Sequence, residues 1–236
     1  MLTMVPYTRD LILIGGGHAH ALVIKAWGMD PLPGARLTVV NPGPTAPYTG
    51  MLPGYVAGHY ERDELEIDLV RLCRHAGARL ILDKMVDINQ SRREVTLESR
   101  GTLAYDIASI DVGITAKLNV LGFADYGIGA KPLNMYADRW RSFLAQAVKG
   151  QSASDVAVIG GGIAGCELAM AMAFALRSVG VSPRVTVIEL GPQITGVGGK
   201  ARQRMLMAMR DLGIVVKTSA KVVKVVSDQV LLDGQG

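Results

Sequence analysis

Three glycines, Gly160, Gly162 and Gly165, have the G-x-G-x-x-G spacing that is typical of dinucleotide-binding turns. The apolar run 156–159 before them predicts a buried strand, and the segment 163–179 after them predicts a helix. In this setting the first glycine permits a tight turn, the second lets a pyrophosphate approach the backbone, and the third lets the helix pack closely on the strand. The free N–H groups at the helix N-terminus attract phosphates, so we expect a nucleotide here.

Glu189 ends the next predicted strand, where a carboxylate can accept hydrogen bonds from the two hydroxyls of a ribose. The same carboxylate would repel a 2′-phosphate, and residues 190–192 offer no cation to receive one. We therefore expect NADH rather than NADPH. The alternative is a glycine-rich turn without a ligand, which the agreement of strand, glycines, helix and acid disfavours.

An earlier turn repeats part of this pattern, with Gly15 and Gly17 in the first two glycine positions. His20 occupies the third position, and Asn41 stands where the acidic residue is usual. By itself this turn is either a nucleotide site or only a tight turn, and the repeat favours the nucleotide site. Asn41 can still hydrogen-bond a ribose through its neutral amide.

Histidine and cysteine spacing does not indicate a metal site. His18 and His20 are not spaced as a metal pair on one helix face, and no Asp or Glu accompanies them. We expect His20 to pack in the fold or to lie near a phosphate. Cys73 and Cys166 form neither a CxxC pair nor a zinc-like spacing, which fits a reducing, cytoplasmic setting.

Short apolar runs alternate with helical patterns along the chain, which predicts an α/β fold with parallel sheets. The two copies of strand, glycine turn, helix and strand predict two Rossmann-like nucleotide-binding domains. The predicted strands are 11–14, 36–40, 79–82, 85–88, 94–97, 105–111, 156–159, 184–189, 214–216, 221–226 and 230–232, and the predicted helices are 18–27, 64–75, 137–148, 163–179 and 199–212. Residues 41–60 are rich in Pro and Gly and predict a long functional loop.

Composition excludes several classes of protein. A hydrophobic content of 49% with 19% charged residues excludes intrinsic disorder. The net charge of +4 is too small to indicate nucleic-acid binding, and the basic segment 200–210 is interpreted as a solvated helix face rather than an anion-binding patch. No basic leader starts the chain, and no apolar run approaches the roughly 18 residues of a membrane span.

The segments GGGHAH (15–20), TVVNPGPTAPYTGMLPGYVAGHY (38–60) and YDIASIDVG (105–113) resemble the pyridine nucleotide-disulfide oxidoreductase superfamily, whose flavoproteins have two dinucleotide-binding domains. More narrowly, they resemble an NADH dehydrogenase-like branch that is often fused ahead of a selenide, water dikinase. The resemblance covers nearly the whole chain. It implies an FAD-binding domain in residues 1–125 and an NAD-binding domain in residues 126–236.

The resemblance also implies roles for individual residues. The FAD-binding set is Gly15, Gly17, His18 and His20 for the pyrophosphate, Asn41 for the ribose, Gly50, Met51 and Leu52 beside the isoalloxazine, Met85 for the adenine, and Asp111 and Gly113 in a second turn. The NADH-binding set is Gly160, Gly162, Ile163, Gly165 and Glu189. Glu167 matches a glutamate near the nicotinamide and flavin rings, although an acid in the first turns of a helix is also favoured by the helix dipole alone.

The reaction implied is hydride transfer from NADH to flavin N5, followed by electron transfer to an acceptor, with a quinone as first expectation and a selenium or sulfur species as second. Thiol chemistry is disfavoured, because the CxxxxC pair of the disulfide reductases is missing. A nucleotide-binding or redox-sensing module without turnover is the alternative from another class.

The family continues beyond the region that this sequence covers. We therefore expect the 236 residues to be the N-terminal part of a longer enzyme and to hold FAD poorly by themselves. In the full-length form we expect a fused or partner selenide, water dikinase, and peripheral membrane contact is an open alternative to a purely cytoplasmic location.

Overall fold

The computed structural model describes residues 6–113, 118–194 and 196–234. The chain divides into two compact units, and the second unit takes one segment from within the first. Unit 1 consists of Met1–Tyr48 and Asp63–Ile114, and unit 2 consists of Thr49–Arg62 and Thr115–Gly236. Each unit contains one of the two glycine turns.

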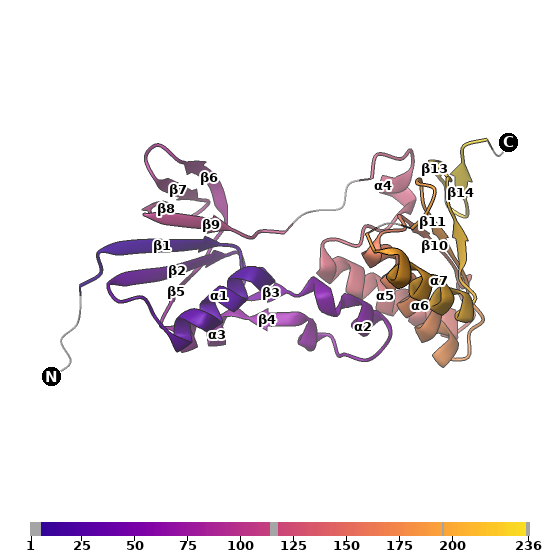
Figure 1. Cartoon of the computed structure of the whole chain (residues 1–236), viewed down its shortest axis with the longest axis horizontal. Helices are drawn as coiled ribbons and strands as arrows, with labels where there is room; N and C mark the ends of the chain where they lie inside the picture. The colour runs from indigo at the N-terminus through magenta and orange to yellow at the C-terminus, as the bar shows by residue number, and fades with distance from the viewer. Residues whose placement is uncertain (1–5, 114–117, 195, 235–236) are drawn as a thin grey trace. The chain divides into compact units, whose positions relative to one another are not determined.

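Unit 1 is built on a parallel sheet with the strand order β5-β2-β1-β9. Figure 1 shows α1 and α3 on one face of this sheet and the antiparallel strands β6, β7 and β8 on the other. Its elements are β1 (Arg9–Ile14), α1 (His18–Met29), β2 (Ala35–Asn41), β3 (Thr45–Pro47), η2 (Asp63–Leu65), β4 (Glu66–Asp68), α3 (Leu69–Ala76), β5 (Arg79–Leu82), β6 (Met85–Asn89), β7 (Glu94–Leu97), β8 (Gly101–Ala104) and β9 (Ile107–Ile110).

Strand β1 is buried on both faces, as a central parallel strand requires. Leu13 packs with Ile24 of α1 and Leu69 of α3, whereas Ile12 and Ile14 pack with the β6–β8 layer. Successive side chains of a strand point to opposite faces, so this one apolar run holds both layers together.

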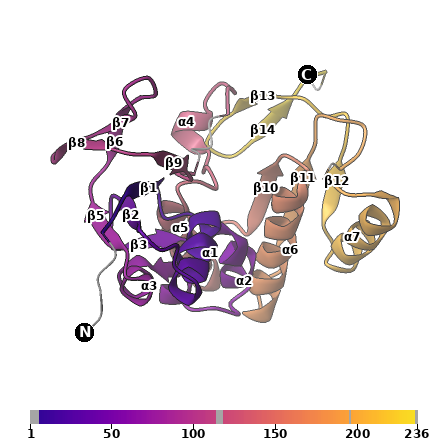
Figure 2. The ribbon, with the colours of Figure 1, turned by 60° about the vertical axis from the view of Figure 1, so that its left-hand side comes forward.

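Unit 2 has a three-stranded parallel sheet with the order β10-β11-β12 and a separate β13–β14 hairpin. Figure 2 shows β10 and β11 beside α6. Its elements are η1 (Thr49–Met51), α2 (Leu52–Val56), α4 (Phe123–Tyr126), α5 (Leu133–Val148), β10 (Asp155–Ile159), α6 (Ile163–Ser178), β11 (Arg184–Ile188), α7 (Gly199–Asp211), β12 (Val215–Lys217), β13 (Val222–Val225) and β14 (Val230–Leu232).

The segment 49–62 is attached to the helices of unit 2. The indole N–H of Trp140 donates to the backbone oxygen of Val56 at 3.1 Å, and the His59 and Phe174 rings lie 5.4 Å apart. This segment leaves unit 1 after Tyr48 and returns to it at Asp63.

The α/β fold with parallel sheets is confirmed, and several local predictions are wrong. The helix predicted over 64–75 begins at Leu69, because Asp68 accepts the N–H of Arg71 and caps it there. The loop predicted over 41–60 contains β3, η1 and α2. The strand predicted over 105–111 is shorter, because β9 covers only Ile107–Ile110.

Candidate nucleotide-binding turns

The turn of unit 2 has the geometry of an open phosphate cradle. Gly160 follows β10 with a φ of +108°, which favours glycine, and a Cβ added to it would meet nothing within 4 Å. Gly162 caps α6 without a side-chain hydrogen bond, and the first turn of α6 carries no acid. A Cβ at Gly165 would collide with the backbone oxygen of Gly160, so only glycine lets α6 approach so closely. These residues fit a pyrophosphate at the α6 N-terminus.

Glu189 lies directly after β11, and each of its carboxylate oxygens accepts one backbone N–H. Oε2 accepts the N–H of Gly161 at 2.7 Å, and Oε1 accepts the N–H of Gly191 at 2.7 Å. A carboxylate has about four lone-pair positions, so Glu189 can still accept hydrogen bonds from a ribose. The structure thus brings Gly160, Gly162, Gly165 and Glu189 together, and Ile163 is exposed as the first residue of α6.

A cavity of about 1070 Å³ within unit 2 reaches this turn and is lined in part by Gly160 and Gly162. Its other wall includes Tyr136, Trp140 and Phe143 of α5. Tyr136 is 6% exposed, its hydroxyl has no hydrogen-bond partner among the described residues, and burial raises the pKa of this phenol. Sequence reasoning missed Tyr136, although its helical spacing from Trp140 and Phe143 places all three on one face.

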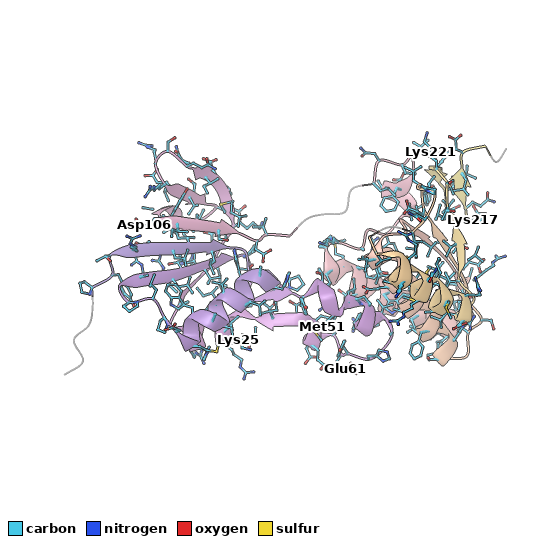
Figure 3. All side chains as sticks on the ribbon, in the orientation of Figure 1. Lys25, Met51, Glu61, Asp106, Lys217 and Lys221 are labelled. Atoms are coloured by element: carbon cyan, nitrogen blue, oxygen red, sulfur yellow. The ribbon has the colours of Figure 1, made fainter. Side chains whose placement is uncertain are left out.

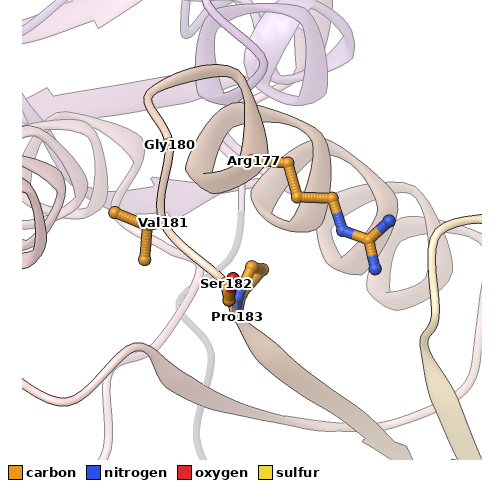
Figure 4. A pocket seen from close by; sticks show the side chains of 5 residues that line it. All are labelled: Arg177, Gly180, Val181, Ser182 and Pro183. Atoms are coloured by element: carbon orange, nitrogen blue, oxygen red, sulfur yellow. The ribbon is translucent and has the colours of Figure 1, made fainter.

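A smaller hollow of about 380 Å³ lies at the other end of α6 and is formed by Arg177 and residues 180–183 (Figure 4). This hollow contains none of the predicted site residues.

The turn of unit 1 brings together Gly15, Gly17, His20, Asn41 and Asp111. Asn41 Oδ1 accepts the N–H of Gly16 at 3.0 Å, as Glu189 does for Gly161 in unit 2. The Asn41 amide nitrogen donates to the backbone oxygens of Gly43 at 2.8 Å and Thr45 at 3.1 Å. Both donor hydrogens of Asn41 are therefore used within the protein, and the side chain is 8% exposed.

His20 occupies the third glycine position and fills the space between the turn and β9. Its Nδ1 lies 2.7 Å from the backbone oxygen of Gly15, and its Nε2 lies 2.8 Å from Ser109 Oγ. Because a carbonyl oxygen only accepts, Nδ1 carries a proton. Ser109 was not predicted. It lies on β9, two residues before Asp111, whose N–H continues the pairing with β1 beyond the end of the strand.

The Asp111 carboxylate lies against the N-terminus of α1. Its Oδ2 accepts the N–H of His20 at 3.4 Å, and a Cβ at Gly17 would collide with the carboxylate. Helix α1 itself has no side-chain cap and no acid in its first turn. The free amides of the turn fit a phosphate, but the carboxylate lies where an anion binds at a helix N-terminus.

The other predicted residues are spread over both units. In unit 1, His18 is exposed with its ring 5.9 Å from that of Tyr48, Met85 packs against the β1–β2 core at the start of β6, and Gly113 is exposed with a φ of +72°. In unit 2, Gly50 is exposed, Met51 (labelled in Figure 3) is half-buried, Leu52 is buried and Glu167 is exposed on α6.

Both cysteines are buried free thiols. Burial raises the pKa of Cys73 to about 11. The pKa of Cys166 is raised by burial and by the carboxylates of Glu189 and Glu167, and its thiol donates to the backbone oxygen of Gly161 at 3.6 Å. Because the thiolate is the reactive form, neither cysteine is set up as a nucleophile.

Among the described residues, no group of three or more His, Cys, Asp and Glu side chains could hold a metal ion. No helix in the described part of the chain combines the length and the apolar character that crossing a membrane requires.

Two parallel sheets, each with a glycine turn leading into a helix, define an α/β protein with two nucleotide-binding turns. A comparison with protein families matches residues 9–236 to the family described as pyridine nucleotide-disulphide oxidoreductase. The chain belongs to the pyridine nucleotide-disulphide oxidoreductase family. The predictions of this superfamily and of its Rossmann-like fold are confirmed.

Solved structures with the same fold include a sulfide:quinone oxidoreductase from Aquifex aeolicus, with a TM-score of 0.77, 17% identity and coverage of 95% of this chain and 54% of that one. NDH2 from Plasmodium falciparum in complex with NADH has a TM-score of 0.75, 17% identity and coverage of 94% and 50%. An NAD-dependent persulfide reductase from A. fulgidus has a TM-score of 0.73, 24% identity and coverage of 94% and 43%. The chain thus spans about half the length of these structures. A comparison with curated protein sequences gave no match.

Proposed function

We propose that the chain is the nucleotide-binding part of an FAD-dependent NADH oxidoreductase, with NADH at the turn of unit 2 and FAD at the turn of unit 1. The observation that carries the proposal is the open cradle at Gly160, with Glu189 hydrogen-bonded to the same turn. Membership of the family supports the predicted pair of cofactors.

Residues of unit 2 would hold NADH through backbone amides and one carboxylate. The amides at the α6 N-terminus would bind the pyrophosphate, and Glu189 would accept hydrogen bonds from the adenosine ribose. Glu189 would disfavour a 2′-phosphate by charge repulsion. In the family, bound FAD supplies the group that accepts a hydride and passes electrons on.

Unit 1 would hold the FAD pyrophosphate at Gly15–Gly17 and His18. Asn41 would lie near the ribose, Met85 near the adenine and Gly113 in a second FAD-contacting turn, as the resemblance implies. His20 and Asn41 would stabilise the backbone conformation of the turn, because both side chains hydrogen-bond to that backbone. The roles of Gly50, Met51, Leu52 and Glu167 near the rings, and the division into domains 1–125 and 126–236, stay predictions.

A quinone is the proposed electron acceptor. The fold is shared with a sulfide:quinone oxidoreductase and with NDH2, whereas the likeness to an NAD-dependent persulfide reductase favours a sulfur or selenium acceptor as the second choice. The fused selenide, water dikinase, the cytoplasmic location and a peripheral membrane contact stay predictions.

A non-catalytic NADH-binding module is the second candidate. The turn of unit 2 is open, whereas the Asp111 carboxylate packs against the turn of unit 1. This difference favours a protein that binds NADH in unit 2 without FAD in unit 1. Such a module would bind NADH and turn nothing over.

Calorimetric titration of the chain with NADH and NADPH tests the proposal. We expect NADH to bind roughly tenfold more tightly, which corresponds to about 1.4 kcal/mol. Gly162→Val should abolish binding, because its side chain would stand in the cradle. Gly198→Val is the matched control, since Gly198 caps α7 with nearly the same backbone angles, φ −70° and ψ 167° against φ −71° and ψ 175° for Gly162. Equal binding by Gly162→Val would refute the assigned cradle.

Turnover separates the two candidate functions. With FAD present, the oxidoreductase should oxidise NADH faster when a water-soluble quinone is added, and a persulfide should have less effect. NADH binding without any NADH oxidation would instead support the module.

A further inference from the structure

Helix α1 lacks the side chain that usually caps a helix N-terminus. The N-cap residue is Gly17, which has no side chain, and no Asp or Glu stands in the first turn. A capping side chain normally accepts the N–H of the second or third helical residue. Here the N–H of His20, the third residue of α1, is accepted by Asp111 Oδ2 at 3.4 Å.

Asp111 reaches this position because β9 runs parallel to β1 and ends beside the turn. The backbone N–H of Asp111 donates to the oxygen of Ile14 at 2.8 Å, which continues the β1–β9 pairing by one residue. This bond places the carboxylate over Gly17, where a Cβ would collide with it. The cap therefore comes from the residue directly after β9, which is remote from α1 in sequence.

The two turns differ in this respect. In unit 2, no acid lies in the first turn of α6, Glu189 binds the turn from the β11 side, and the space over Gly160 is open. In unit 1, Asn41 takes the place of Glu189, and an acid stands instead at the helix N-terminus. A carboxylate and a phosphate favour the same positive end of a helix and repel each other.

We propose that Asp111 caps α1 in the cofactor-free chain and competes with the FAD pyrophosphate, so that its carboxylate lowers the affinity of the turn for FAD. This inference rests on the proposed function, because it takes the turn of unit 1 as the FAD site. It reverses the simpler expectation that Asp111 is an attractive FAD contact.

Titration of the chain with FAD, followed by quenching of flavin fluorescence, tests the competition. Asp111→Asn retains a capping oxygen and removes the charge, so we expect FAD to bind roughly tenfold more tightly than to the original chain. Asp111→Ala removes both, so we expect tighter FAD binding together with faster hydrogen exchange at the His20 amide. Asp106→Asn is the matched control, since Asp106 precedes β9 at its other end, accepts the N–H of Asp10 and is labelled in Figure 3.

Three results of these titrations would overturn the competition between Asp111 and FAD, and one of them would also overturn the FAD site. Unchanged or weaker FAD binding by both Asp111 variants, while the original chain binds FAD, would overturn the competition and leave the FAD site intact. Failure of the original chain and of every variant to bind FAD would overturn both the FAD site and the inference. Tighter binding by Asp106→Asn of the same size would reduce the effect to overall charge and would also overturn the inference.

Discussion

Asn41 and Glu189 occupy equivalent positions in the two turns and form the same hydrogen bond to the turn. Each stands at the end of the second strand of its sheet and accepts the N–H of the middle glycine, Gly16 or Gly161. A buried or half-buried amide needs such a partner, so the residue at the end of the second strand shapes the turn in addition to its predicted ligand role. Sequence reasoning assigned only the ligand role to both residues.

Glu189→Gln should weaken NADH binding by about tenfold, or ~1.4 kcal/mol. Only one oxygen remains, so either Gly161 or Gly191 loses its acceptor, and a charged acceptor for the ribose is lost as well. NADH titration measures the change, with the exposed Asp211→Asn on α7 as a control of equal charge change. Unaltered NADH affinity in Glu189→Gln would mean that the carboxylate has neither role.

Cys73 should make stability fall with pH above about 9. Its pKa is raised by burial from 9.0 to about 11, so the unfolded chain loses the thiol proton first. The stability is fully present below pH 9 and is lost as pH rises towards 11, at up to about 1.4 kcal/mol per pH unit. Thermal unfolding of the original chain and of Cys73→Val between pH 8 and 11 measures this, and equal slopes would contradict it.

At the scale of elements, the third glycine position decides how close each helix lies to its strand. Gly165 allows α6 to touch the backbone of Gly160, whereas His20 inserts a ring that bonds Gly15 and Ser109. The first helix is thus held through side-chain hydrogen bonds and the second through direct backbone contact. These two hydrogen bonds explain why a histidine, His20, can stand at the third glycine position of the fingerprint.

Gly165→Ala should destabilise unit 2 by about 1–3 kcal/mol, because its methyl group would collide with Gly160 and push α6 outward. Gly199→Ala is the control, since a Cβ at this first residue of α7 meets nothing within 4 Å. It should be neutral or slightly stabilising. Thermal unfolding compares the two variants, and equal melting temperatures would show that α6 tolerates the methyl group.

The sequence predicts an element well where its apolar residues follow a single spacing throughout, either that of a strand or that of a helix. The strands of both sheets and the helix over α6 follow from runs such as Leu11–Ile14 and from the glycines beside them. The start of α3 was wrong because Asp68, a capping residue inside an apparently helical pattern, stops the helix there. Residues 41–60 were misjudged because proline and glycine also occur in short elements such as α2.

Candidate site residues could be predicted from the sequence where a single local motif contains all of them. Gly160, Gly162, Gly165 and Glu189 come together as the motif predicts. The capping contact of Asp111, the Ser109 bond to His20 and the orphan hydroxyl of Tyr136 depend on tertiary packing. No local pattern contains that information, and Tyr136 lies just outside the helix predicted over 137–148.

At the scale of the whole molecule, the chain contains the same arrangement of strand, glycine turn, helix and strand twice, once in each unit. Both sheets place their first strand beside their second and lead from the first strand through a glycine turn into a helix. The segment 49–62 belongs to unit 2 although it interrupts unit 1 in sequence, and it carries the predicted residues Gly50, Met51 and Leu52. The proposed NADH and FAD sites lie in different units.

We propose that NADH held by unit 2 reduces FAD held by unit 1. The most direct test is to mix NADH, without oxygen, with the chain reconstituted in excess FAD and to follow the yellow flavin colour. We predict loss of the colour, faster than with free FAD and NADH, and no such loss with Gly162→Val. A flavin that binds and stays yellow while NADH is also bound would contradict the account.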